Sequence, residues 1–126
     1  MQWLKPKTDD HKWQEMNKEV LRLTAEKDLD KALCSAGELF EYTKKSYGSK
    51  HKNTVIALNN LGIINMVRED FDEAESYLLS ALQVSEKVSG RSSKEVSMIN
   101  MNLAKLYAAK ANKISVFNEV FVSKAL

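Results

Sequence analysis

Few residues in this chain combine the side-chain type and the spacing that catalysis needs. The single cysteine, Cys34, lies between Ala32 and Ala36 with no base positioned near it along the chain, so we expect an unreactive residue near the core. The two histidines, His11 and His51, are far apart, and neither has a Cys, Asp or Glu at metal-ligand spacing. The sequence also lacks a phosphate-binding glycine loop and a nucleophile motif. We therefore expect no enzyme, no cofactor and no metal site.

A basic cluster could bind a charged ligand. It consists of Lys44, Lys45, Lys50, His51 and Lys52. The cluster could meet an acidic partner or a phosphate, or it could be an ordinary solvated loop. The whole chain has 19 basic and 17 acidic side chains and a net charge of +2, which gives no support for a nucleic-acid partner.

The sequence has no feature of a membrane or secreted protein. No apolar run approaches the length of about 20 residues that spans a bilayer. The first residues lack the basic segment followed by an apolar one that a secretory signal needs, and a single cysteine cannot form an internal disulfide. We expect a cytoplasmic protein without membrane insertion.

The elements that must position these side chains are helices nearly throughout. The chain has one proline and four glycines, and apolar residues recur at three- and four-residue steps. Gly48 and Gly90 fit the left-handed position that follows a helix. The predicted helices lie near residues 9–26, 29–46, 54–68, 71–88, 93–110 and 114–125.

Two of the predicted helix starts have the spacing of a capping box. Asp70 is followed by Glu73, and Ser92 is followed by Glu95, three residues later in each case. Such a pair places a capping oxygen and a reciprocal carboxylate at the first turn.

An internal repeat of 42 residues organises the chain. Positions separated by 42 residues keep their character, as in the pairs Asp28/Asp70, Leu29/Phe71, Ala32/Ala74, Ala36/Leu78, Leu39/Ala81, Phe40/Leu82 and Gly48/Gly90. Asn60-Leu61-Gly62 corresponds to Asn102-Leu103-Ala104, which lies 42 residues later. A helix pair this short cannot bury its apolar face alone, so successive pairs must stack.

The middle unit resembles a tetratricopeptide repeat. The resemblance rests on Ala57-Leu58-Asn59-Asn60-Leu61-Gly62, on Asp70-Phe71-Asp72-Glu73-Ala74 and on Ala81-Leu82, and the long period is similar to the kinesin light chain type. It implies an all-α, right-handed solenoid of three antiparallel helix pairs. The expected organisation is one domain, 1–126, with an N-terminal extension at 1–8 and repeats at about 12–52, 53–94 and 95–126.

The third unit departs from this pattern near its middle. Lys113 stands where Phe71 predicts an apolar residue, so we align Ile114 there and accept an insertion of one residue. On the middle unit's first helix, the stripe Leu58, Leu61, Gly62 and Asn65 is expected to pack against the partner helix. Gly62 and Ala104 are small where two helices approach closely.

The resemblance implies a concave groove that holds a peptide or helix of another protein. The residues expected to line it are Asn59, Asn60, Ile63, Met66, Met98, Met101, Asn102 and Lys105. Asparagine amides could bind a peptide backbone, and methionines could adapt to varied side chains. The alternative is that the methionines fill the core between repeats and the asparagines cap local backbone.

The lysine, asparagine and arginine clamp of chaperone-binding repeat domains is mostly missing. Asn60 matches one member, but Asn17 and Leu21 stand where a basic residue and an asparagine are expected. Met98 and Asn102 stand where lysine and arginine are expected. We therefore do not expect this chain to bind chaperone tails.

The last predicted helix is apolar on more than one face. Its apolar residues are Ile114, Val116, Phe117, Val120, Phe121 and Val122, whereas the outer face of a terminal helix should be polar. Either further repeats follow Leu126 or a second copy covers this helix, with Val116, Val120 and Phe121 as the expected dimer surface. Two functional classes remain open, namely a peptide-binding adaptor and a self-assembly element.

Overall fold

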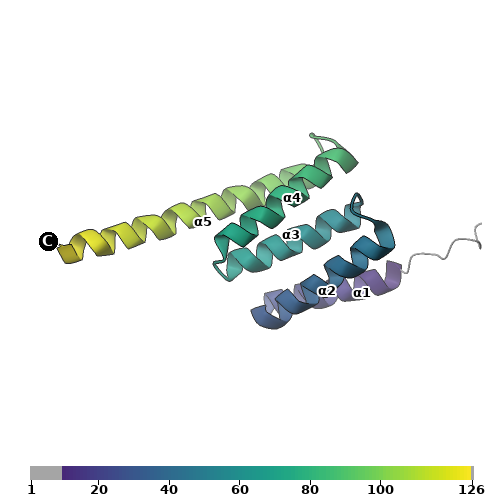
Figure 1. The fold of residues 1–126 in the computed structure, drawn as a ribbon, viewed down its shortest axis with the longest axis horizontal. Coiled ribbons are helices and arrows are strands. Elements are labelled where there is room, and N and C mark those ends of the chain that lie inside the picture. Colours follow the sequence, from purple (N-terminus) through teal and green to yellow (C-terminus); the bar gives the residue numbers. More distant parts are fainter. Residues whose placement is uncertain (1–9, 126) are drawn as a thin grey trace, which may run out of the picture.

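Five α-helices make up the part of the chain that the computed structural model describes, which is residues 10–125, with side chains through Lys113 (Figure 1). The helices are α1 (Asp10–Ala25), α2 (Leu29–Tyr47), α3 (Lys52–Val67), α4 (Phe71–Ser89) and α5 (Lys94–Ala125). Residues 10–125 contain no strand, which confirms the prediction of an all-α helical repeat protein. The predicted extension at 1–8 and the side chains of Val116, Val120 and Phe121 lie outside the described part.

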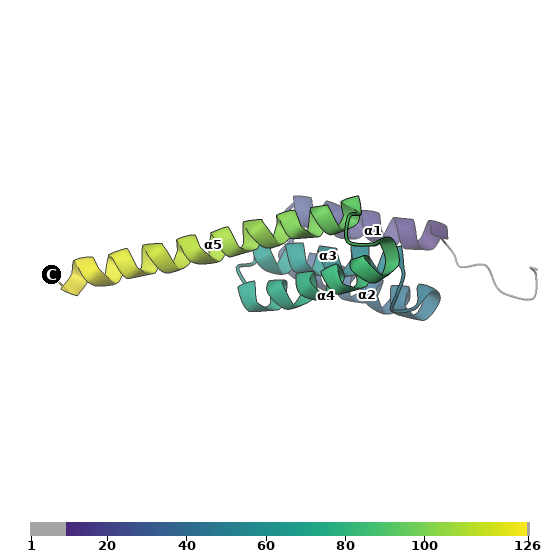
Figure 2. The same ribbon diagram turned by 90° about the horizontal axis from the view of Figure 1, so that it is seen from above.

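Each helix packs against the next one along the chain, and α3 also contacts α1 and α5. The helices therefore form two layers, with α1, α3 and α5 in one and α2 and α4 in the other (Figure 2). This arrangement is a stack of helix hairpins in which the first helices of successive repeats lie side by side. The right-handed twist of the expected solenoid stays a prediction.

The core is divided between the two junctions of the stack. One cluster of buried residues joins α1, α2 and α3 and includes Trp13, Leu39 and Ile64. The other joins α3, α4 and α5 and includes Leu78 and Ile99. Burying a side chain of this size stabilises the fold by about 1.5–3 kcal/mol, so most of the stability comes from contacts between successive helices.

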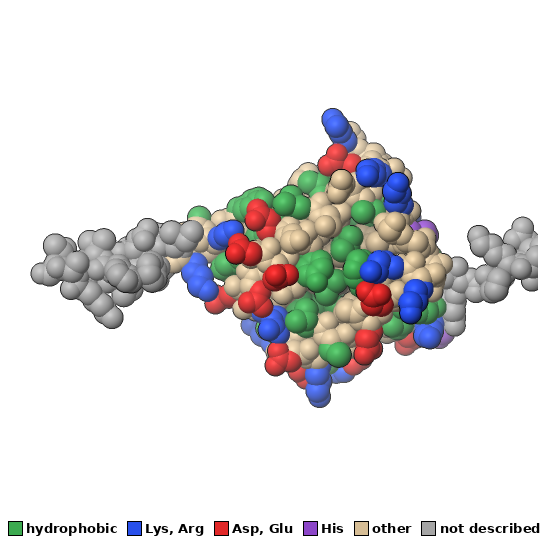
Figure 3. Space-filling model, viewed as in Figure 1, with side chains coloured by type: hydrophobic (Ala, Val, Ile, Leu, Met, Phe, Trp, Pro, Cys, Tyr) green, Lys and Arg blue, Asp and Glu red, His purple; other side chains and the backbone are tan. Residues whose placement is uncertain are grey.

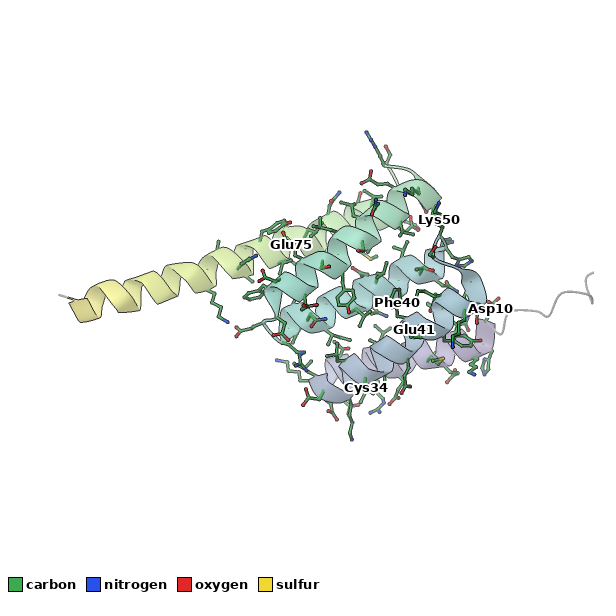
Figure 4. All side chains as sticks on the ribbon, in the orientation of Figure 1. Asp10, Cys34, Phe40, Glu41, Lys50 and Glu75 are labelled. Carbon is green, nitrogen blue, oxygen red and sulfur yellow. The ribbon has the colours of Figure 1, made fainter. Side chains whose placement is uncertain are left out.

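Two aromatic side chains, Phe40 and Tyr77, pack against both core clusters. Figure 4 shows Phe40 on the side of α2 that faces α4. The two clusters are therefore joined into one continuous core. Neither repeat buries its own apolar face without the next.

Backbone conformations with positive φ end four of the helices. Gly48 and Gly90 have φ values of 91° and 86°, as expected for glycine after a helix. Lys27 and Glu69 have φ values of 60° and 67° in the turns after α1 and α3. A left-handed conformation costs a residue with a Cβ about 1–2 kcal/mol, which the packing of the hairpins must offset.

The predicted capping boxes are wrong in detail. Asp70 makes no side-chain hydrogen bond to the start of α4, and its carboxylate instead accepts a hydrogen bond of 3.0 Å from Arg68. At the start of α5 the capping hydroxyl belongs to Ser93, not Ser92, and accepts from the backbone N–H of Val96 at 3.2 Å.

The sixth helix predicted at 114–125 is not a separate element, because α5 continues without a turn to Ala125. Ala111 occupies the position that Lys27 and Glu69 hold in the two preceding turns, and alanine is the residue most favourable to helix. Lys113 then stands where Phe71 anchors α4 in the core. A fold-back would lack that first apolar contact, so the helix continues.

Candidate functional site

Exposed apolar side chains identify one surface of the stack as a candidate for binding. Leu21 of α1 and Met101 of α5 are 52% and 60% exposed, and Val67 of α3 and Met98 of α5 are also exposed. The three helices lie next to one another in the same layer (Figure 2). We call their shared solvent-facing surface the first-helix face. Large apolar side chains gathered on one surface are typical of an interaction site.

The first-helix face exists because the other sides of these helices are occupied. On α3, Gly62 and Leu58 face α4, while Leu61 and Ile64 belong to the core shared with α1 and α2. Ile63 lies on the remaining side and is half-buried. A subtraction of 42 leads from Ile63 to Leu21, and an addition of 42 leads to Lys105, which is exposed.

Two asparagine pairs tie the first helices together. The Asn60 amide donates to the Oδ1 atom of Asn17 at 2.6 Å, and the Asn102 amide donates to the Oδ1 atom of Asn59 at 2.9 Å. Asn17 and Asn59 are 42 residues apart, as are Asn60 and Asn102, so the same bond is made at both junctions. Each bond to a neutral amide contributes about 0.5–1.5 kcal/mol. The pairs also set how the first helices lie against each other.

The predicted site residues are divided by this arrangement into a buried and an exposed group. Asn59 and Asn60 are each 6% exposed, and Met66 is half-buried against the core between α3, α4 and α5. Met98, Met101 and Lys105 are exposed on α5. An external partner can therefore reach the α5 residues directly, whereas the asparagines offer it only the amide atoms that the pairs leave free.

Three residues of this surface were missed by the sequence analysis as site residues. Asn17 and Leu21 follow from Asn59 and Ile63 when 42 is subtracted, so the repeat itself was the signal that could have found them. Val67 lies four residues after Ile63, one helical turn further along α3.

The side of the stack formed by α2 and α4 is different. Figure 3 shows this side, where charged side chains surround a group of hydrophobic side chains that lies over α3. Cys34 of α2 is exposed, so the prediction that it lies near the core is wrong. Its Sγ atom lies 3.9 Å from a carboxylate oxygen of Glu38. Trp13 is buried, whereas Tyr107 is exposed and does not belong to the core.

The basic cluster lies around the α2–α3 turn. His51 caps α3, since its Nδ1 atom accepts from the backbone N–H of Asn53 at 2.9 Å. The His51 ring also lies 4.6 Å from that of Tyr47. Burial raises the pKa of Tyr47 to about 12, with a smaller contribution from its hydrogen bond to Asp10. His51 is thus a structural residue of the turn.

No group of His, Cys, Asp and Glu side chains in the described part could hold a metal ion. Within residues 10–125, no helix is both long and apolar enough to cross a membrane.

Comparison with known proteins connects this geometry to a family. Residues 53–114, which include α3 from its second residue, the whole of α4 and the first part of α5, match the family model of the tetratricopeptide repeat. No curated protein matches the chain.

Proposed function

Because the chain belongs to the tetratricopeptide repeat family, whose members are protein-interaction modules, we propose that it is an adaptor that binds a peptide or helix of another protein on the first-helix face. The family is a non-enzymatic repeat family, and we propose no reaction for this chain. The observation that carries the proposal is the exposure of Leu21, Val67, Met98 and Met101 on three adjacent helices.

The chemistry of the surface suits a peptide with apolar side chains. Met98 and Met101 have unbranched, polarizable side chains that can adapt to different apolar groups. Lys105 lies one turn beyond Met101 and offers a cation to a carboxylate or a carbonyl oxygen. Asn59 uses its Oδ1 atom in the pair with Asn102, which leaves its amide N–H groups for a peptide backbone.

The proposal is tested by capture of partners from native extract with a matched pair of variants. Met101→Glu/Lys105→Glu changes the first-helix face, while Val88→Glu/Lys87→Glu makes the same charge change on α4. All four side chains are exposed, so both variants should fold, as circular dichroism can check.

A partner that is retained by the unmodified chain and the α4 variant and lost with the α5 variant supports the adaptor function. A partner that is captured equally by all three chains would place binding on another surface and contradict the proposal.

A second candidate function is self-assembly through α5. The observation that favours it is an exposed side of α5 whose equivalent on α3 is buried, as with Tyr107 and Asn65. The test is the mass of the chain in solution, where a monomer at high concentration would contradict self-assembly.

A further inference from the structure

One side of α5 is uncovered, although the equivalent side of α3, in the preceding repeat, is covered. On α3, Leu58, Gly62 and Asn65 are buried, and Gly62 lies against Leu78 of α4. A shift of 42 residues leads from these to Asn100, Ala104 and Tyr107 on α5, all of which are exposed. At the last pair, Asn65 is 4% and Tyr107 is 44% exposed. We call this side of α5, together with the adjacent Leu79 of α4, the end face.

The end face continues from α5 onto α4. The Glu75 carboxylate raises the pKa of Tyr107 by accepting a hydrogen bond, which places Tyr107 beside α4. Figure 4 shows Glu75 on the part of α4 that lies next to α5. Leu79, one turn after Glu75, is 45% exposed and borders a shallow depression on α4. Apolar surface is therefore exposed on both helices.

The preceding repeat shows what kind of element fits such a surface. Gly62 lies so close to Leu78 of α4 that a Cβ at this position would be 2.6 Å from the Leu78 Cδ2 atom. Ala104 is the equivalent of Gly62 and has the smallest side chain after glycine, but its Cβ requires a helix on the end face to lie slightly further away than α4 lies from α3. The end face therefore fits an antiparallel helix with an apolar residue at the Leu78 position.

Residues 114–125 match the sequence expected of this missing helix, but they lie on the continuation of α5 and away from the end face. Residues 114–125 align with α4 at an offset of 43, which places Ile114 at Phe71 and Phe121 at Leu78. In the structure α5 runs straight through these residues and projects beyond the stack (Figure 1). A straight α5 cannot bring residues 114–125 back onto its own residues 100–111.

We propose that residues 114–125 of a second copy cover the end face, so that two chains exchange their last helical segments. The two α5 helices would then lie antiparallel and cross near Asn112, and each end face would receive its missing helix from the partner chain. The interface is isologous, as a two-fold dimer requires. This inference rests on the second candidate function and adds to it the surface, the segment and the register.

The register is tested by disulfide cross-linking. Cys34 is exposed, so Cys34→Ser should be tolerated and provides the background. One chain then carries Ala104→Cys and another Phe121→Cys, and the two are mixed, unfolded, refolded together and oxidised. We expect a covalent dimer that contains one chain of each kind.

The control replaces Ala104→Cys by Glu38→Cys, an exposed position on α2 outside the end face. Cross-linking at an equal rate in this control would contradict the proposed register. A single chain with both Ala104→Cys and Phe121→Cys that closes an internal disulfide at the mass of 14.3 kDa would overturn the exchange, because its own segment would then cover the end face.

Light scattering separates this inference from the general proposal of self-assembly. We expect the unmodified chain to have about twice the monomer mass, Ala104→Glu to be a monomer, and Met101→Glu on the first-helix face to remain a dimer. A monomeric unmodified chain would overturn both proposals. A dimer that Ala104→Glu does not dissociate would leave self-assembly in place and overturn the end face as its interface.

A substitution at Ala111, where the turn after the first helix of the third repeat is missing, provides a second test of the exchange. Ala111 occupies the position at which Lys27 and Glu69 adopt a positive φ, a conformation that glycine adopts easily. We expect Ala111→Gly to favour the turn and to shift the population from dimer to monomer. A dimer population that Ala111→Gly leaves unchanged would show that straightening of α5 does not drive the exchange.

Discussion

The first two repeats fill the same space between their helices in opposite ways. In the second repeat the first helix has Gly62 and the second helix has Leu78, which lies against it. In the first repeat the equivalent positions hold Val20 and Ala36, both fully buried in one core cluster. Each pair has four side-chain carbons in total, so the large and small residues have exchanged sides. The repeat conserves the total volume at this contact, and either helix can provide it.

A second contact differs in polarity. In the first repeat the indole N–H of Trp13 donates to the Oγ1 atom of Thr43 at 2.8 Å, inside the core. In the second repeat the equivalent positions hold Val55 and Ser85. Valine has no donor, and the fully buried Ser85 hydroxyl has no hydrogen-bond partner. The second repeat therefore has a buried hydroxyl, that of Ser85, but no donor equivalent to the Trp13 indole.

The largest expected effect comes from removing the large residue of the second repeat. Leu78→Ala should lower the free energy of unfolding by about 2–5 kcal/mol, because it leaves a cavity beside Gly62. Chemical denaturation checks it. A loss similar to that of an exposed control, Val88→Ala, would show that the contact with Gly62 is unimportant.

The next effect tests the exchange of volumes directly. Gly62→Val should cost about 1–3 kcal/mol, because the added carbons overlap the Leu78 side chain. The double variant Gly62→Val/Leu78→Ala recreates the pair of the first repeat and should be more stable than Leu78→Ala alone. A double-mutant cycle in denaturant measures this coupling, and strictly additive losses would contradict the comparison.

The polar contact should give smaller effects of opposite sign in the two repeats. Trp13→Phe removes the N–H that donates to Thr43 and should lower the free energy of unfolding by about 0.5–1.5 kcal/mol for the lost hydrogen bond alone. Ser85→Ala removes a buried hydroxyl without a partner and should raise the free energy of unfolding by about 1 kcal/mol. Thermal and denaturant unfolding of both variants provide the measurement. Destabilisation by Ser85→Ala would mean that the hydroxyl does have a partner.

The smallest effect concerns the turns that begin the second helices. Lys27 has a φ of 60°, and Lys27→Gly should relieve the cost of this conformation while increasing the entropy of the unfolded chain. The expected net gain is about 0.5 kcal/mol. Lys31→Gly, at an exposed position within α2, serves as the control and should destabilise. A loss of stability in both variants would contradict strain at Lys27.

Much of the fold followed from the sequence, because the signals were local or repeated. The apolar spacing placed the first four helices to within about two residues, and the stripe along the middle unit's first helix placed Gly62 against the second helix of its repeat. Periodicity of this kind depends only on helix geometry. The 42-residue offset leads from Ile63 to Leu21 and from Asn59 to Asn17, so these two residues of the first-helix face could also have been predicted.

Other features depended on which element covers which surface, and only the tertiary structure decided them. Asn60 and Asn17 form a pair because α1 and α3 lie side by side, a contact to which no spacing along one helix points. Tyr107 lies four residues after Leu103 and so has the helical spacing of a core residue, yet it is exposed because no helix packs over it. Ala111 is compatible with a turn or a helix, and the absence of an apolar anchor at Lys113 favours the straight α5. Local sequence thus determined the helices and their contact stripes, while burial depended on neighbours that a single helix does not encode.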